Sequence, residues 1–265
     1  MSVLVLLTQY MKITLLGTGT STGVPEIGCQ CPVCTSPNKK DTRWRTSALI
    51  ETNHTRILID VTPDFRMQML PLPFKPIHGV LLTHEHYDHV GGIDDLRPFG
   101  RFGAIDIYAE QNVSDALMSR IPYCFATNPY RGVPNINLQV IDTTPFHIDG
   151  VKITPIRVMH HRLPILGYRI GNFAYLTDVK TIPSRELYKL THLDVLVVSA
   201  LRKTEHISHQ TLDEALVLIQ QIKPKEAYLT HLGHQMGLHD EVQKELPKGV
   251  FVGYDGMKLR SASLS

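Results

Sequence analysis

The sequence predicts an α/β protein in which two β-sheets pack together and are flanked by helices. Short apolar runs rich in Val, Ile and Leu recur through both halves of the 265-residue chain. Segments with a helical period lie between these runs, and no repeat or low-complexity linker divides the chain. Because a sheet with an apolar face must bury it against another layer, interspersed strands and helices favour this layered arrangement.

In the first half, short strands are expected on either side of tight turns. A polar, glycine-rich loop at 17–23 follows the first strand, and the turn at 52–55 separates a pair of strands. A Thr-Pro-Asp sequence at 62–64 is a typical helix start. The expected strands cover residues 12–16, 47–51, 56–60, 78–82 and 105–108, and a short helix is expected within 61–70.

In the second half, one strand and one helix have the strongest signals. Residues 195–199 are almost entirely apolar, which is typical of a strand buried on both faces. Residues 211–221 repeat apolar side chains every three to four positions and therefore predict a helix. Further strands are expected at 138–141, 151–158, 166–170, 173–176 and 227–230.

Composition and charge restrict the classes of partner. The chain is 43% hydrophobic and 20% charged, as ordinary globular proteins are. Its net charge of +2 produces no field that would recruit nucleic acid or an anionic membrane. No apolar stretch approaches the roughly 20 residues that span a bilayer. A binding partner must therefore be inferred from a local site.

The first ten residues, MSVLVLLTQY, are expected to be an extension. They lack the basic start and the cleavage site of a signal peptide. Met11 opens the first strand, so the extension is interpreted either as a misassigned start or as an extra edge strand. A single domain is expected over 11–265.

The most informative motif is Thr-His-Glu-His-Tyr-Asp-His at 83–89, directly behind an apolar strand. Imidazole is the commonest protein ligand for transition metals, and Asp supplies a harder oxygen ligand. In an extended segment, His84 and His86 project to the same side. Asp88 and His89 follow on the turn and face a second point. One loop could therefore serve two metal ions.

Other potential ligands follow other apolar strands. Any one of these histidines alone would be interpreted as a hydrogen-bonded structural residue. Their repeated position at strand ends instead favours a site built from loops on a rigid sheet. Adjacent His160 and His161 cannot both face one ion from an extended backbone. The residues in question are His160 or His161, Asp178, His206, His209, His231 and His234.

Three of the four cysteines lie in one short segment, as Cys29, Cys31 and Cys34. This spacing is poor for a disulfide framework and suits metal ligation by thiolates. A reducing, cytoplasmic compartment is expected. Cys124 stands alone beside aromatic residues and is predicted to be a buried, inert thiol.

Together these motifs resemble the metallo-β-lactamase superfamily, whose signature is HxHxDH. The resemblance implies a four-layer αβ/βα sandwich with metals at the edge between the sheets. The family pattern around the third ligand favours His160, and His161 is the alternative. By the resemblance, one ion is held by His84, His86 and His160, the other by Asp88, His89 and His231, and Asp178 bridges the two.

The cysteine segment is similar to that of the PhnP-like phosphodiesterases. These proteins carry a structural zinc held by three Cys and one His, and His234 matches the fourth ligand beside Cys29, Cys31 and Cys34. A site closed by four protein ligands leaves no position for water. It would pin the cysteine loop against the loop that carries the last active-site histidine. A quinone-cofactor biosynthesis protein has a similar cysteine loop but a degraded first motif.

The implied reaction is hydrolysis of a small cyclic or activated phosphodiester. Two metals about 3.5–4 Å apart would hold a shared hydroxide for attack on phosphorus, and the carboxylates suit Mn²⁺ as well as Zn²⁺. By the resemblance, Asp88 takes part in catalysis and His209 is the general acid, placed where helix amides favour an anion. His206 is the second choice. Asp255 would orient a ligand histidine.

Other functions are weighed against this one. A tRNA 3′-processing nuclease would need a long arm and basic tracts, which are not visible here. Thioester or lactam hydrolysis could use the same centre, but the carboxylate-rich second site favours phosphodiesters. A non-catalytic metal-binding accessory protein would not need the complete ligand set. We expect a small-molecule phosphodiester as partner, no nucleic acid or membrane and, by the resemblance, a homodimer.

Overall fold

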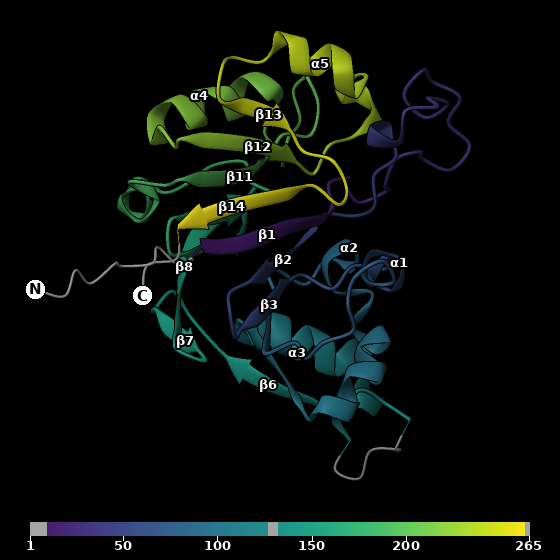
Figure 1. The fold of residues 1–265 in the computed structure, drawn as a ribbon, viewed down its shortest axis with the longest axis vertical. Helices are drawn as coiled ribbons and strands as arrows, with labels where there is room; N and C mark the ends of the chain where they lie inside the picture. Colours follow the sequence, from purple (N-terminus) through teal and green to yellow (C-terminus); the bar gives the residue numbers. More distant parts are fainter. Residues whose placement is uncertain (1–9, 127–131, 263–265) are drawn as a thin grey trace, which may run out of the picture.

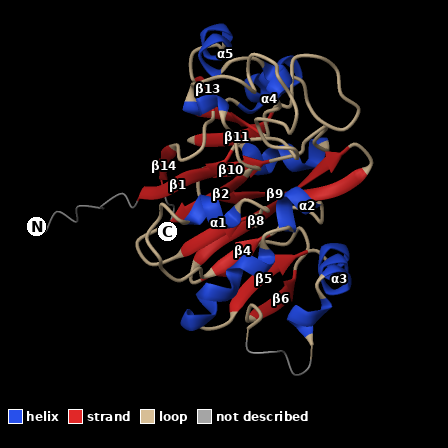
Figure 2. Cartoon of the chain, turned by 90° about the vertical axis from the view of Figure 1, so that its right-hand side faces the viewer, coloured by secondary structure: helices blue, strands red, loops and turns tan. Residues whose placement is uncertain are grey.

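The computed structural model describes residues 10–126 and 132–262. Two seven-stranded mixed sheets pack face to face, and helices flank them (Figures 1 and 2). The predicted α/β class and αβ/βα sandwich are confirmed. The expected extension lies outside the described residues except for Tyr10, which begins the first strand. None of the described helices is both long and apolar enough to cross a membrane.

The first sheet is antiparallel on one side and parallel on the other. Its first strands form antiparallel pairs, and the parallel half begins where β3 pairs with β4. The sheet order is β14 (Lys258–Ala262), β1 (Tyr10–Gly17), β2 (Ser47–Glu51), β3 (Arg56–Ile59), β4 (Gly79–Leu81), β5 (Ile105–Ala109) and β6 (Ile136–Val140).

The second sheet repeats this mixture. Its last four strands in the chain are parallel, and the earlier ones are antiparallel hairpins. The order is β13 (Val250–Val252), β12 (Glu226–Thr230), β11 (Val195–Ser199), β10 (Phe173–Leu176), β9 (Leu163–Ile170), β8 (Val151–His160) and β7 (Phe146–Ile148).

Helices flank the sheets and carry some of the loops. The helix predicted at 211–221 is α4 (Leu212–Ile222), and the one predicted within 61–70 is the shorter α1 (Phe65–Met69). The other α-helices are α2 (Tyr87–Val90), α3 (Gln111–Arg120) and α5 (His239–Glu245). The 3-10 helices are η1 (Lys39–Asp41), η2 (Ile93–Phe102), η3 (Pro122–Phe125), η4 (Ser184–Leu190) and η5 (His234–Met236).

The alternation of β11 shows how the layers are held together. Val195 and Val197 belong to the apolar core between the sheets, whereas Leu196 and Val198 pack in the core that contains α4. The strand is therefore buried on both faces, as predicted. Each such side chain removed from water contributes roughly 1.5–3 kcal/mol, so both interfaces are strong. This rigid frame brings the ends of several strands to one edge.

Candidate metal centre

The predicted ligands converge where strand ends from both sheets meet. The loop after β4 and the helix α2 that follows it carry four of them, β8 ends on His160, and Asp178 and His231 follow β10 and β12. The two sheets are tied at this edge, since the Tyr168 hydroxyl donates to the Leu82 carbonyl and the Leu166 amide to that of Thr83. Loops that are far apart in sequence therefore face a common point.

Asp178 lies at the centre of this group and is fully buried. Its Oδ2 is 2.8 Å from His89 Nε2 and 3.8 Å from His84 Nε2. Its Oδ1 is 2.8 Å from His231 Nε2 and 3.4 Å from His209 Nδ1. The carboxylate thus contacts imidazoles that come from separate loops, and its Oδ2 lies between His89 and His84, as a carboxylate shared by two groups of ligands would.

One cluster on Asp178 consists of His84, His86 and His160. His84 Nε2 lies 3.0 Å from His86 Nδ1, and the His160 ring is 5.3 Å from that of His86, centroid to centroid. His160 Nδ1 lies 3.1 Å from the Asp178 carbonyl and 3.0 Å from that of Ser208. A proton on Nδ1 serves these acceptors and leaves Nε2 free. His161 is exposed on the following turn, so the structure brings in His160.

The other cluster consists of Asp88, His89 and His231. Asp88 Oδ2 is 3.2 Å from His89 Nε2 and 3.6 Å from His231 Nε2. The two imidazole rings are nearly parallel, with an angle of 5° between their planes. Together with Asp178, these residues place four ligand atoms within 4.8 Å of one another. That is the spacing of donors around a single ion.

Several of these atoms lack hydrogen bonds among the described residues. His89 Nε2, His231 Nε2 and Asp178 Oδ1 are buried and make none, although each has a neighbour of opposite character nearby. A buried unpaired polar atom costs about 1–3 kcal/mol. A divalent ion between the donors would satisfy them all. Imidazole and carboxylate ligands suit Zn²⁺ and Mn²⁺, so the residues fit such ions.

Charge in the centre shifts the pKa values of the histidines in opposite directions. Burial lowers the pKa of His231, but Asp178 and Asp88 raise it more strongly, to about 9. The same carboxylates overcome burial at His89 and raise its pKa. Burial and the neighbouring His89 lower the pKa of His84. Because metal ions bind neutral imidazole, an ion entering beside Asp88 would displace protons from His89 and His231.

A carboxylate not considered in the sequence analysis orients His89. Asp60 is fully buried at the end of β3, and its Oδ2 lies 2.7 Å from His89 Nδ1. It also accepts hydrogen bonds of 2.9 Å from the Thr83 amide and hydroxyl. A proton held on Nδ1 turns His89 Nε2 toward the centre. An acid that ends an apolar strand, as Asp60 does, was the available signal.

The prediction for Asp255 is wrong. This carboxylate touches no ligand histidine; it accepts hydrogen bonds from the Thr18 hydroxyl at 2.7 Å and from the Trp44 amide at 2.6 Å. Burial raises the pKa of Asp255 to about 6. It ties the glycine-rich loop to the segment before β2, and Asp60 performs the orienting role expected of it.

Both candidate acids border the centre. The His209 ring lies 4.6 Å from that of His160 and 4.9 Å from that of His231, and the His206 ring is 5.0 Å from His209. Burial, with the neighbouring His231, lowers the pKa of His209 to about 3. His206 Nδ1 accepts a 3.3 Å hydrogen bond from the Ser208 amide. His209, His160 and Asp178 also place ligand atoms within 4.8 Å of one another, so His209 lies as close to the centre as a ligand does, and His206 lies behind it.

The helix N-terminus beyond His209 is not open to an anion as expected. Thr211 caps α4: its hydroxyl accepts from the Glu214 amide, and the Glu214 carboxylate accepts from the Thr211 amide. The amide of Gln210 donates to the Val179 carbonyl. These three amides are already used, so the expected contribution of the helix end to anion binding is wrong for them.

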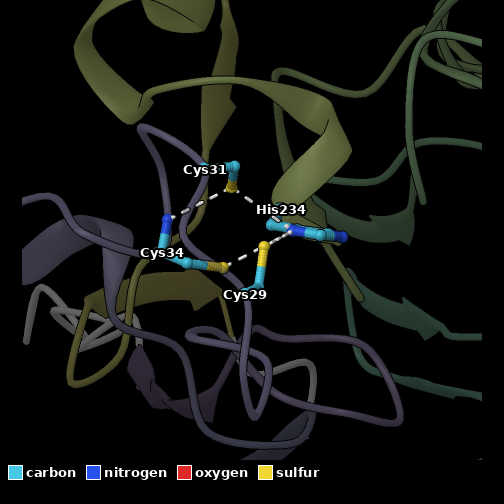
Figure 3. A group of neighbouring side chains, drawn as sticks. All are labelled: Cys29, Cys31, Cys34 and His234. Carbon is cyan, nitrogen blue, oxygen red and sulfur yellow. Dashed lines mark hydrogen bonds between the residues drawn. The ribbon is translucent and has the colours of Figure 1, made fainter.

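A second cluster lies beside this edge, and Figure 3 shows three cysteines of one loop around His234. His234 Nδ1 is 3.1 Å from Cys29 Sγ and 3.4 Å from both Cys31 Sγ and Cys34 Sγ. The Cys34 amide lowers the pKa of Cys31 to about 6, whereas burial raises the pKa of Cys34 to about 11. Three thiols and an imidazole match a closed zinc site. Cys124 is a buried free thiol, as predicted.

Comparison with known proteins gives one family and several relatives. The profile of the β-lactamase superfamily domain matches residues 55–232. An octanoyltransferase of Porphyromonas gingivalis is 48% identical over 251 residues, which are 94% of this chain and 51% of that protein. Coenzyme PQQ synthesis protein B of Methylobacterium radiotolerans is 29% identical over 127 residues, 40% of this chain and 42% of that protein. The chain thus spans about half the length of the curated relatives it matches.

Solved structures give a consistent result. A diphosphatase of the PhnP family is 36% identical with a TM-score of 0.90, covering 96% of this chain and 99% of that one. Zn²⁺-bound PqqB of Methylobacterium extorquens is 17% identical with a TM-score of 0.78 (94% and 99% covered). The short form of human tRNase Z is 16% identical with a TM-score of 0.70 (94% and 98% covered). The last two likenesses concern the fold alone.

Proposed function

This chain belongs to the β-lactamase superfamily, in its PhnP-like group, and from that premise we propose that it hydrolyses small cyclic or activated phosphodiesters with two metal ions. The observation that carries the proposal is the buried Asp178, whose carboxylate lies against both groups of imidazoles: His89 Nε2 and His231 Nε2 of one group are each 2.8 Å away, and His84 Nε2 of the other is 3.8 Å away. A single carboxylate between two such groups is suited to hold two ions near one water.

The proposed ligand assignment follows the two clusters. One ion takes His84, His86 and His160, the other takes Asp88, His89 and His231, and Asp178 bridges them. Mn²⁺ or Zn²⁺ suits this mixture of nitrogen and oxygen donors. A third ion, Zn²⁺, is assigned to Cys29, Cys31, Cys34 and His234.

When bound, the ion pair would supply a water of lowered pKa and neutralise charge on the phosphoryl oxygens. The protein residues position the metal ligands and give a proton to the leaving group. Asp60 keeps His89 in the tautomer that faces the centre. His209 borders both ligand groups and is placed to give a proton to the leaving oxygen, with His206 beside it. Burial keeps His209 neutral, and the negative charge of a bound phosphate would favour its protonated form.

The substrate class has two members that share this chemistry. A cyclic or activated diester and a diphosphate both present a phosphorus atom with an oxygen leaving group. The diphosphatase named among the solved structures supports testing the second member beside the first. Small molecules are favoured over RNA because the chain has a net charge of only +2.

Two other functions receive less support. Octanoyl transfer, the activity named for the P. gingivalis relative, is less well supported, because imidazole and carboxylate donors around a common point suit water activation. Half of that protein also lies outside the match. A non-catalytic metal-binding protein would not require seven converging ligands together with an orienting carboxylate.

The test offers three substrates to protein loaded with Mn²⁺. They are bis-p-nitrophenyl phosphate, a ribose cyclic phosphate and a dinucleotide joined by a diphosphate, and hydrolysis of each is measured. We expect turnover of the first compound and of one of the other two. Asp178→Asn, prepared in the same way, serves as the control for contaminating phosphatases. Mass spectrometry confirms that the ions are bound. If such protein turns over none of the three compounds, the proposal is contradicted.

A further inference from the structure

A segment of four residues joins the two ligand clusters. His231 points into the proposed hydrolytic centre, and His234 points at the three cysteines. The backbone of His231 is left-handed, with φ of 55°, which is uncommon for any residue but glycine. Such a conformation persists only when the surroundings over-determine it. The contacts of this segment therefore decide where the His231 imidazole lies.

The backbone of the segment is held on both sides. The Leu232 amide donates to the Thr18 carbonyl at 2.8 Å, and the Thr20 amide donates back to the Leu232 carbonyl at 3.1 Å. On the other side, the Gly233 amide donates to the Leu201 carbonyl at 2.9 Å. Only Leu232 and Gly233 separate the two histidines, and the loop that holds Leu232 runs on along the chain to Cys29, so a displacement of His234 and of the cysteine loop would reach His231 over a short stretch of chain.

The cysteine loop reaches this segment through one side chain. Within the described chain, every hydrogen bond and ion pair found between residues 26–34 and 231–236 ends on His234. The apolar packing beneath the loop is small and consists of Val24, Val33 and Cys34 with Leu238 against them. An ion held by the cysteines and His234 would be the main tie between the loop and the segment.

The two clusters differ in their exposure to oxidants. Cys29 and Cys31 are partly exposed, whereas Asp178 and His231 are each 1% exposed. Thiolates react with peroxide, while imidazoles and carboxylates are inert to it under the same conditions. The three sulfurs lie within 4.8 Å of one another, so a disulfide between two of them needs only a small rearrangement. Two of the three oxidisable ligands are therefore accessible, whereas Cys34 is buried.

We propose that the cysteine cluster is a redox-controlled clamp on His231, through which oxidation of the thiolates switches off the hydrolytic centre. The inference rests on the proposed dinuclear site and adds a form of regulation to it. His231 belongs to the Asp88 cluster, so the ion held there is loosened first. The ion held by His84, His86 and His160 involves no residue of the segment and stays bound.

The chemistry needs a peroxide as oxidant. One thiolate attacks hydrogen peroxide, so that an S–O bond forms, the O–O bond breaks and hydroxide leaves. A second thiolate attacks this sulfur, so that an S–S bond forms and a second hydroxide leaves. In sum, two thiolates, one peroxide and two protons give one disulfide and two waters. Because the disulfide removes two of the four zinc ligands, the zinc ion is released from the cluster.

The experiment treats the metal-loaded full-length protein with one equivalent of hydrogen peroxide. Zinc release is followed with a chromogenic chelator, disulfide by mass spectrometry after alkylation, and remaining metal by elemental analysis. We expect one zinc ion and about one further ion to leave per disulfide, and diester hydrolysis to fall about 10–100-fold. Dithiothreitol with added Zn²⁺ and Mn²⁺ should restore both. Cys124→Ser is the matched control and should respond like the natural protein.

Two variants separate positioning from general damage. Cys31→Ser should bind no zinc at the cluster and should lose the ion beside His231. Cys31→His keeps four donors, because zinc accepts two cysteines and two histidines. This variant should therefore bind the zinc ion at the cluster and also the ion beside His231. If Cys31→Ser does not fold, the peroxide titration of the natural protein alone decides whether the cysteine cluster controls the ion beside His231.

Zinc release and disulfide formation that leave the hydrolytic ions and turnover unchanged would overturn the clamp while sparing the proposed function. Absence of turnover before any oxidant is added would overturn the proposed function instead. Loss of turnover before zinc is released would also overturn the clamp, because the sequence of events would be reversed.

Discussion

Three residues at the centre of the site adopt the left-handed backbone conformation. Asp60, Asp178 and His231 have φ values of 62°, 54° and 55°, and each follows the end of a strand. Asp and His are among the few residue types enriched in this region. The turn lets the chain leave the sheet while its side chain points back over the strand ends. Backbone strain of this kind is typical of functional sites.

At Asp178, replacing the carboxylate by an amide tests the bridge. Asp178→Asn should keep the fold, because Asn tolerates the same left-handed backbone. The rate of bis-p-nitrophenyl phosphate hydrolysis should fall about 10³-fold or more, because the transition state loses several kcal/mol of stabilisation. Steady-state rates and thermal unfolding measure both effects. A variant that keeps its activity within tenfold would show that Asp178 does not bridge ions.

The role of Asp60 leads to a smaller expected effect. In Asp60→Asn one oxygen becomes an amide donor that meets the proton on His89 Nδ1, so the imidazole loses its orientation. Metal affinity or activity should fall roughly 10–100-fold. The matched control is Asp142→Asn, on an exposed turn. Equal behaviour of the two variants in a metal titration would contradict the orienting role.

That these side chains gather at one edge could be predicted, because imidazoles at successive strand ends are rare without a metal; the ions that they hold stay a prediction. The choice between His160 and His161 followed from a family pattern, and its physical reason is the backbone turn that starts at His161. Asp60 was missed because an acid that ends a strand is usually solvated. Asp255 was misplaced, since nearness in a motif does not say which loop a side chain faces.

At the scale of elements, α4 positions the segment that carries His209. Its first turn is held by the reciprocal Thr211 and Glu214 hydrogen bonds, and Thr211 also pairs with Arg202 across the loop. Lys180, two residues beyond Asp178, forms an ion pair with Glu214 at 2.8 Å. The helix start therefore connects the loop after β10 with the loop after β11.

Removing this cap should weaken the protein measurably. Thr211→Ala loses the hydroxyl that accepts from the Glu214 amide and should lower the free energy of unfolding by about 1 kcal/mol. Urea unfolding gives the value. Thr204→Ala, an exposed threonine of the same loop, should change it little. If the free energy of unfolding falls equally in the two variants, the Thr211 cap does not stabilise the protein.

Strands were easier to predict than helices. Apolar runs mark β10 and β11 within a residue of their ends, because these strands are buried on both sides. The helix α2 was interpreted as a turn, since it is only four residues long. The 3-10 helix η2 contains Gly and Pro, which hide its helical period. Helix α3 carries Val113 and Leu117 on one face and was overlooked.

At the scale of the whole molecule, a buried polar cluster joins the two ends of the chain. The Arg43 guanidinium donates to the Thr18 hydroxyl and the Gly253 carbonyl, and lies 3.4 Å from His239 Nδ1. Asp41 accepts a hydrogen bond from the His239 amide. In this way the loop between β1 and β2, which projects beside α5 in Figure 1, is fastened to the body of the protein.

This cluster makes stability depend on pH. Burial, with the cations Arg43 and Lys40, lowers the pKa of His239 to about 4 from 6.5. Between these values the unfolded chain binds a proton that the folded protein does not, so stability is lost as pH falls from 6.5 to 4. The slope is at most about 1.4 kcal/mol per pH unit. The raised pKa of Asp255 acts in the opposite sense.

A comparison of two proteins isolates the histidine. His239→Gln lacks the titrating group but keeps Asp255, so its unfolding free energy should fall less steeply with acid than that of the natural protein. Urea unfolding at pH 7, 6, 5 and 4 measures both slopes. Parallel slopes would show that His239 is not the group responsible.

The central claim, a dinuclear centre bridged by Asp178 and separate from a zinc held by cysteines, is tested most directly by anomalous diffraction. Crystals of the protein purified with Mn²⁺ and Zn²⁺ should show two peaks about 3.5–4 Å apart on either side of the Asp178 carboxylate. A third peak, with the edge of zinc, should lie among Cys29, Cys31, Cys34 and His234. A single peak beside Asp178, or none, would contradict the account.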